Sequence, residues 1–266
     1  MEKTIFWLTV LISLFAFATL AQEKPVQDRN EAPSRQNEKN TAMNVLVQQA
    51  NVAINAKDWQ GAISPLQQLI AIDPAQWQSY SGLGDAQMNL GQYGQAIETY
   101  EKGIQAAESN TTLDPKIPST DPAKKKAGIG HMLTSEGNCY LKLKKNKEAI
   151  AAYSKAAAMD PNPGLAYFNL CATMYNTGDV EGAISACEKA IAADPNKADA
   201  YFIKGSLLIA GSTTDKNGRV QAPPGTVEAL KKYLELAPNG PHAKDVKDML
   251  EYVGSKVEAT GGNTKQ

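Results

Sequence analysis

The side chains that most often perform chemistry are few in this chain and lie far apart. Only two histidines, His131 and His242, occur among the 266 residues. The sequence contains no HExxH metal motif, nucleophile elbow or phosphate-binding loop. No pair of carboxylates stands out by its spacing. We therefore expect no catalytic residues, no cofactor, no bound metal and no enzymatic activity.

The remaining reactive side chains are three cysteines, Cys139, Cys171 and Cys187. Their spacing does not match a zinc site. A disulfide between Cys171 and Cys187 would require Cα atoms within about 7 Å of each other. Because free cysteine is among the most buried residue types, we expect buried free thiols, with a Cys171–Cys187 disulfide as the alternative.

The glycine-rich stretch GLGDAQMNLG, which begins at Gly82, superficially suggests a nucleotide-binding loop. Gly84, however, belongs to a series of small residues that recurs along the chain, mostly at intervals of 34 residues: Ala50, Gly84, Gly137, Cys171 and Gly205. A second series follows twelve residues behind: Ala62, Ala96, Ala149 and Ala183. Small residues let two helices approach closely, so both series indicate repeated helix pairs instead of a nucleotide site.

Helix-ending signals recur with the same period. Asp-Pro occurs at Asp73, Asp160 and Asp194, and proline ends a helix because it lacks an amide hydrogen and restricts the preceding residue. The segment NTGD, residues 176–179, predicts a turn between two helices. Repetition of this kind builds a core that one helix pair could not bury alone.

The pattern resembles the tetratricopeptide repeat, a helix-turn-helix unit of 34 residues. The fourth unit shows it best, as GLAYFNLCATMYNTGDVEGAISACEKAIAADPNK. The resemblance implies an all-α fold, a right-handed α-solenoid of five repeats. We expect the solenoid over residues 42–254, with repeats at about 43–76, 77–110, 130–163, 164–197 and 198–240. Apolar residues at helical spacing predict a C-terminal capping helix at 241–254.

Two insertions interrupt the repeats, at about 111–129 and 211–224. We interpret the first as a loop followed by an early start of the next helix, with a basic docking patch at residues 124–126 as the alternative. The second contains KNGR, and Asn-Gly is a strong signal for a two-residue hairpin turn. We therefore expect a short β-hairpin near residues 216–220.

The N-terminus predicts export. An apolar run from Ile5 to Leu20 follows a lysine and precedes Ala21, so residues 1–21 resemble a cleavable signal peptide. A retained membrane anchor is the alternative, although the run is shorter than the roughly 20 residues of a spanning helix. Residues 22–41 are polar and predict a flexible linker, and residues 255–266 a disordered tail.

The tetratricopeptide resemblance also implies a binding groove, lined by the first helix of each unit. The candidate groove residues are Asn51, Asn55, Asp85, Asn89, Asn138, Phe168, Tyr175, Asn176 and Phe202. Asparagine can donate to and accept from a peptide backbone. Phe168 and Phe202 are 34 residues apart, so we expect them to gather with Tyr175 as an aromatic patch. In the alternative, each ring packs between repeats as part of the core.

The function that follows is a non-enzymatic protein-interaction scaffold of the envelope or secreted space. Its partner would be a peptide or a helix of another protein. The net charge of −1 gives no reason to expect nucleic acid, and we expect no membrane insertion after signal cleavage. The alternative is a structural or accessory subunit of an envelope assembly or enzyme complex, bound through the insertions or the repeat edges.

Overall fold

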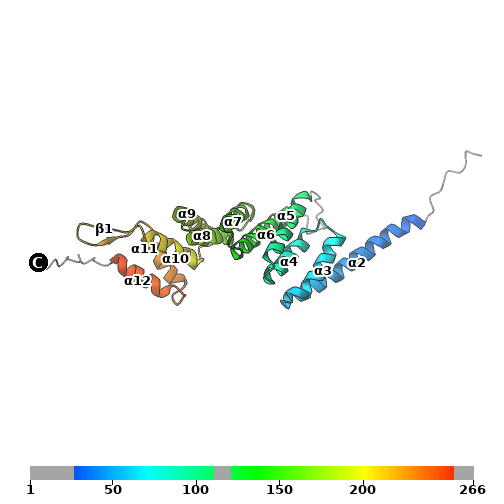
Figure 1. Cartoon of the computed structure of the whole chain (residues 1–266), viewed down its shortest axis with the longest axis horizontal. Helices are drawn as coiled ribbons and strands as arrows, with labels where there is room; N and C mark the ends of the chain where they lie inside the picture. Colours follow the sequence, from blue (N-terminus) through cyan, green and yellow to red (C-terminus); the bar gives the residue numbers. More distant parts are fainter. Residues whose placement is uncertain (1–26, 111–120, 255–266) are drawn as a thin grey trace, which may run out of the picture. The chain divides into compact units, whose positions relative to one another are not determined.

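The computed structural model describes residues 27–110 and 121–254, and these residues form an almost entirely helical protein (Figure 1). The predicted all-α solenoid fold is confirmed. The helices are α2 (Gln27–Asn55), α3 (Trp59–Ile72), α4 (Trp77–Asn89), α5 (Tyr93–Ser109), α6 (Pro122–Lys142), α7 (Asn146–Met159), α8 (Gly164–Thr177), α9 (Val180–Ala193), α10 (Ala198–Ile209), α11 (Thr226–Leu236) and α12 (Ala243–Gly254).

The helices from α3 onward pack in chain order, each against the next (Figure 1). The chain divides into two compact units within α2, between Gln48 and Gln49, and the packing described here is that of the second unit. Asp73, Asp160 and Asp194 are the C-cap residues of α3, α7 and α9. The Asp-Pro pairs therefore end these helices as the sequence predicts.

The turn between the two helices of each of the first four pairs repeats one backbone conformation. Its left-handed residue is Lys57, Gly91, Lys144 or Gly178, with φ between 56° and 80°. After each of these residues a backbone amide returns to a carbonyl five residues earlier, as in the bond from Asp179 N to Met174 O at 3.0 Å. This bond is the signature of a Schellman motif, which satisfies the open carbonyls at a helix end.

Each tight helix pair has a small residue on its first helix facing a larger one on its second. A side chain at Gly84 would collide with the ring of Tyr100, and one at Gly137 would collide with Tyr153. Both tyrosines are fully buried. Gly84 therefore serves helix packing, as the periodicity predicts.

The fourth pair places a disulfide at the same position. Cys171 of α8 and Cys187 of α9 are bonded, with Cα atoms 5.0 Å apart and both side chains fully buried. The expectation of free thiols at these two positions is wrong. Their repeat positions are those of the Gly–Tyr contacts, which bring facing helices close enough for a disulfide to span them. Cys139 is a buried free thiol.

The two insertions have different structures. Residues 111–120 lie outside the described part. Asp121 then caps α6, accepting hydrogen bonds from the amides of Ala123 and Lys124 at 2.9 and 3.4 Å. Helix α6 therefore begins well before the repeat unit, and Lys124, Lys125 and Lys126 lie in its first turns.

The second insertion forms the expected hairpin, with β1 (Thr213–Thr214) antiparallel to β2 (Val220–Gln221). Its turn is longer than the two-residue Asn-Gly turn that the sequence suggests, because only Gly218 adopts a positive φ and Asn217 does not. Asp215 organises the turn instead, accepting hydrogen bonds from the amides of Asn217 and Arg219 at 2.8 and 2.9 Å. Strand β2 packs against α12, with Val220 buried.

The N-terminal region differs from the expectation of a flexible linker over residues 22–41. Helix α2 begins at Gln27, so the linker is helical from that residue onward. Gln, Arg, Glu, Ala and Lys fill about half of residues 27–41 and favour a helix without an apolar core, although Pro33 does not. The predicted signal peptide (1–21) and tail (255–266) lie outside the described residues. Within residues 27–110 and 121–254, none of the helices combines the length and apolar character of a membrane span.

Candidate functional site

The first helices of neighbouring units lie near one another. Helix α4 contacts α6, α8 contacts α10, and α10 contacts α12. Between α6 and α8 the link is made by side chains, since Tyr140 and Leu141 of α6 pack against the cluster that holds Leu170 of α8. The end of α2 approaches this series too, since Ile54 Cδ1 lies 3.9 Å from the site of a Cβ on Gly82 of α4. We call the outward surface of α4, α6, α8, α10 and the end of α2 the first-helix face. Every candidate groove residue lies on these helices.

Solvent exposure divides the candidate residues into two groups. Asn51, Asn55, Asn89, Tyr175 and Asn176 are exposed, whereas Asp85, Asn138, Phe168 and Phe202 are half-buried. The exposed asparagines Asn55, Asn89 and Asn176 occupy the same repeat position. The third unit has Lys142 at this position, so the first, second and fourth units present amide groups on the first-helix face.

The half-buried polar residues accept hydrogen bonds from the buried tyrosines. The hydroxyl of Tyr100 donates to Asp85 Oδ1 at 2.7 Å, and that of Tyr153 donates to Asn138 Oδ1 at 2.7 Å. These two hydrogen bonds have the same place in successive units. Asp85 and Asn138 therefore stabilise their own helix pairs, with only part of each side chain open to a ligand.

Asp85 also links two neighbouring units through His131. The Nε2 atom of His131 on α6 lies 3.1 and 3.2 Å from the two carboxylate oxygens of Asp85 on α4. The hydrogen bond to Asp85 raises the pKa of His131 above its ordinary value. Burial, followed by the charge of Asp85, raises the pKa of the Tyr100 hydroxyl. Asp85 is thus the centre of a polar cluster that the sequence spacing alone did not reveal.

The expected aromatic patch takes a different form. Phe202 stacks on His242, with ring centroids 3.8 Å apart and planes at 4°, and also contacts Tyr233 at 5.8 Å. Phe168 lies under the Lys197 ammonium, whose Nζ is 4.4 Å from the ring centroid. Among the described residues no ring contact joins these two phenylalanines to each other or to Tyr175.

Phe202 turns away from the patch because the C-terminal segment covers it. Tyr233 and Val246 are fully buried, and Phe202 packs against the cluster that they form. The amphipathic pattern of the capping helix predicts a cover for α10. The same pattern does not predict that His242, just before the helix, stacks on the ring of Phe202. Phe168 and Tyr175 keep exposed or half-exposed surface, while Phe202 is mainly a packing residue.

A row of apolar side chains runs beside the asparagines and was missed in the sequence. The row is Ile54, Met88, Leu141, Tyr175 and Ile209, each at the same repeat position. Tyr175 is 39% exposed, and Leu165 on the same helix is 57% exposed. Their shared repeat position could have predicted this row from the sequence. An apolar row beside an amide row is suited to bind a polypeptide.

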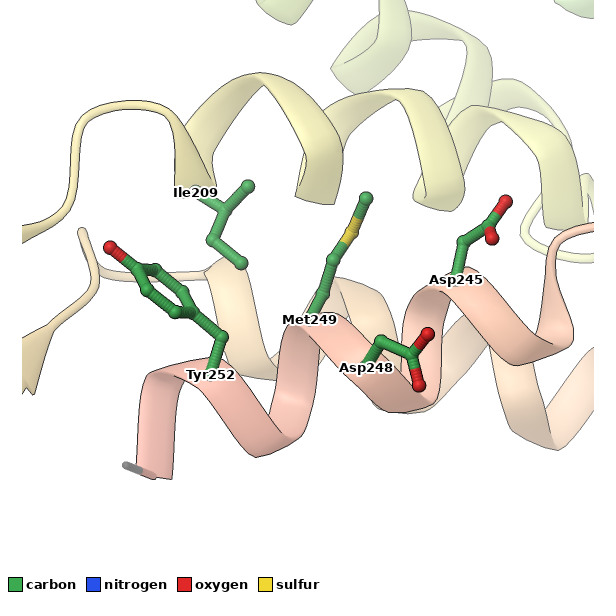
Figure 2. Close-up of a pocket in the computed structure, with 5 residues that line it drawn as sticks. All are labelled: Ile209, Asp245, Asp248, Met249 and Tyr252. Carbon is green, nitrogen blue, oxygen red and sulfur yellow. The ribbon is translucent and has the colours of Figure 1, made fainter. Parts of the chain in front are cut away.

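The row ends in a furrow of about 490 Å³ between α10 and α12 (Figure 2). Its lining residues are Ile209, Asp245, Asp248, Met249 and Tyr252. In the part of the chain that the structure describes, no three His, Cys, Asp or Glu residues come together as a metal site would require.

Comparison with known proteins agrees with this arrangement. The family model described as tetratricopeptide repeat matches residues 53–111 and 140–207. No curated protein matches the chain in sequence.

Several solved structures share the fold. The structure of YrrB, described as a TPR protein with an unusual peptide-binding site, has a TM-score of 0.53 at 20% identity and covers 75% of this chain and 88% of its own. MamA from Desulfovibrio magneticus RS-1 has a TM-score of 0.55 at 16% identity, covering 75% and 97%. PilW, described as a widely conserved type IV pilus biogenesis factor, has a TM-score of 0.53 at 16% identity, covering 79% and 86%.

The fold and the first-helix face define a helical-repeat solenoid, the class of protein that stacks helix pairs into an extended surface. The family match lies within the periodic part of the sequence, and the shared fold agrees with it. The chain contains tetratricopeptide repeats, at residues 53–111 and 140–207.

Proposed function

We propose that this protein is a non-enzymatic scaffold that binds a peptide or a helix of a partner protein on its first-helix face. The observation that carries the proposal is that a row of apolar side chains runs beside the exposed asparagines on the first helices. Exposed asparagines provide donors and acceptors for a main chain, and the neighbouring apolar row provides contacts for side chains. YrrB, which shares the fold, is described as having a peptide-binding site.

We further propose that the protein acts in an oxidising compartment, as a periplasmic or secreted protein. The Cys171–Cys187 disulfide supports this location, because disulfides persist outside the reducing cytosol. The apolar segment that precedes Ala21 supports export by an independent route. PilW, which has a similar fold, is described as a pilus biogenesis factor.

Binding through the insertions is the less favoured alternative. Strand β2 packs against α12 and Val220 is buried, so the base of the hairpin belongs to the fold. The outer turn around Asp215 presents little apolar surface. The hairpin therefore stabilises the C-terminal end of the array better than it would anchor a partner.

Site-specific photo-crosslinking in envelope extract tests the proposal. A benzoylphenylalanine probe placed at Asn89 or Tyr175 is expected to crosslink a partner. Matched probes at Glu98 on α5 and Ser185 on α9, which are exposed on second helices, are expected to give no specific product. A probe at Lys216 reports the hairpin. Crosslinking at Glu98, Ser185 or Lys216 but not at Asn89 or Tyr175 would favour binding through the edges or the insertion.

A further inference from the structure

The furrow between α10 and α12 combines an apolar floor with two carboxylates. Figure 2 shows Ile209 of α10 and Met249 of α12 extending into the same space, and Asp245 one turn before Met249. Met249 Sδ lies 3.9 Å from Ser206 Oγ, so the thioether bridges the two helices. Tyr252, which is 50% exposed, closes one end of the furrow. An apolar side chain of a partner would contact all three of these lining residues.

The charged groups that line the furrow are both acidic. Asp245 and Asp248 have side chains that are 59% and 62% exposed. Lys244 Nζ lies 3.3 Å from Asp248, and His242 Nδ1 lies 3.9 Å from Asp245. Exposed pairs between residues three or four apart contribute little free energy, so neither carboxylate is held firmly by its neighbour. The furrow therefore attracts a positive group.

The furrow continues the apolar row of the first-helix face. Ile209 occupies the repeat position of Tyr175, and their helices α10 and α8 are in contact. Tyr175 is itself 39% exposed. An extended segment seated in the furrow would therefore meet a second apolar contact on the next helix.

We propose that this furrow binds a partner segment in which an apolar side chain adjoins a lysine or arginine. The apolar side chain packs on Ile209, Met249 and Tyr252, while the basic group lies at Asp245 and Asp248. Long basic side chains suit such a place, because their aliphatic stems contact apolar surface and their charged ends stay in water. The proposal rests on the proposed peptide binding by the first-helix face, and it specifies the end of the face and the charge of the ligand.

A displayed library of random peptides, selected on the full chain, tests this proposal. Peptides enriched on the wild type are re-tested on Asp245→Asn/Asp248→Asn, which neutralises the furrow at exposed positions. Glu251→Gln is the matched control, because Glu251 is an exposed residue of the same helix that does not line the furrow. We expect enrichment of Lys or Arg beside an apolar residue. We also expect affinity for the double variant to fall about threefold to tenfold, with no change for Glu251→Gln.

Charge reversal sharpens the test. The variant Asp245→Lys/Asp248→Lys is expected to select peptides with Asp or Glu at the place of the basic residue. Enriched peptides without a basic preference, or equal affinity for wild type and the neutralised variant, overturn the furrow assignment. If such peptides instead lose affinity with Asn89→Ala, the first-helix face still binds and only the furrow is wrong. A library that yields no binders contradicts both proposals.

Discussion

Cys171 and Cys187 hold the repeat positions at which the two preceding units carry a glycine and a tyrosine. In those units the tyrosine hydroxyl donates to a polar residue next to the glycine, Asp85 or Asn138. The fourth unit has Ala172 at that place, which offers no acceptor, and the disulfide joins the helices instead. One covalent bond thus replaces a packed ring and its hydrogen bond.

Removing the disulfide is expected to destabilise the fourth unit. For a sequence separation of 16 residues, the loop-closure estimate is about 3 kcal/mol for Cys171→Ser/Cys187→Ser. The triple variant Cys171→Gly/Ala172→Asn/Cys187→Tyr rebuilds the contact of the third unit and should recover much of the loss. Urea denaturation with and without reductant measures both effects. Equal midpoints for the wild type and the double serine variant would contradict this account.

Glu136 carries an unfavourable charge at its repeat position. At the fourth and fifth units, Lys204 of α10 pairs with Glu188 of α9 at 2.8 Å. At the second and third units, Glu136 stands in place of the lysine and faces Glu101, which stands in place of Glu188. Glu136 is only 9% exposed. Burial, followed by the charge of Glu101, raises its pKa. The ionised form of Glu136 is therefore destabilising in the folded protein.

The pH dependence follows from the sign of that pKa shift. Because Glu136 binds its proton more tightly in the folded state, its protonation adds stability as the pH falls through the raised pKa. Glu136→Gln is expected to raise the free energy of unfolding at pH 7 and to remove this part of the pH dependence. Thermal unfolding between pH 4.5 and 7 measures the change. Glu148→Gln, at an exposed position of α7, is the control, and a stability loss at pH 7 specific to Glu136→Gln would count against the explanation.

At the scale of helices and turns, the repeated left-handed residue is the feature that sets each helix pair. Gly91 and Gly178 suit this conformation, whereas Lys57 and Lys144 adopt it with a full side chain. A Cβ at Gly178 would meet no atom within 4 Å. Substitution there changes only the backbone preference, so the turns offer a test of conformation without steric clash.

Gly178→Ala is expected to cost about 1 kcal/mol, because an L-residue is disfavoured at positive φ. The reciprocal change Lys144→Gly should stabilise the protein by up to about 1 kcal/mol for the same reason. Chemical denaturation of the two variants measures the pair of effects. Two changes of the same sign would show that the turn conformation is not the cause.

The sequence predicts most of the elements because their signals are local and repeat. Small residues, Asp-Pro stops and the turn glycines determine the helix pairs from α4 to α11. The start of α2 was missed because a polar segment without an apolar face resembles a linker. The stacking of Phe202 on His242 was missed because the insertion at about 211–224 breaks the 34-residue register before His242. The contact of Asp85 with His131 was missed because it joins two units, and the pattern within one unit does not predict it.

Across the stacked units, differences between equivalent residues change the chemical character of the first-helix face from one unit to the next. The first-helix face is polar around Asp85 and His131, aromatic around Phe168 and Tyr175, and acidic at the furrow beside α12. The polar region joins α4 to α6 and the furrow joins α10 to α12, so these two regions need neighbouring units in contact. A partner segment that follows the apolar row, as we propose, would meet these regions in order.

Hydrogen–deuterium exchange of the full chain, alone and with a peptide enriched from the random library, shows whether the first-helix face is the binding surface. Binding on the first-helix face and in the furrow predicts new protection in α8, α10, α12 and the adjoining first helices, with α5, α7 and α9 unchanged. Backbone amides inside a helix exchange when the helix opens locally. A bound peptide that stabilises the first helices would make them open less often, so their amides would exchange more slowly. Protection confined to the second helices or to the hairpin at residues 213–221 would contradict the assignment of this face as the binding surface.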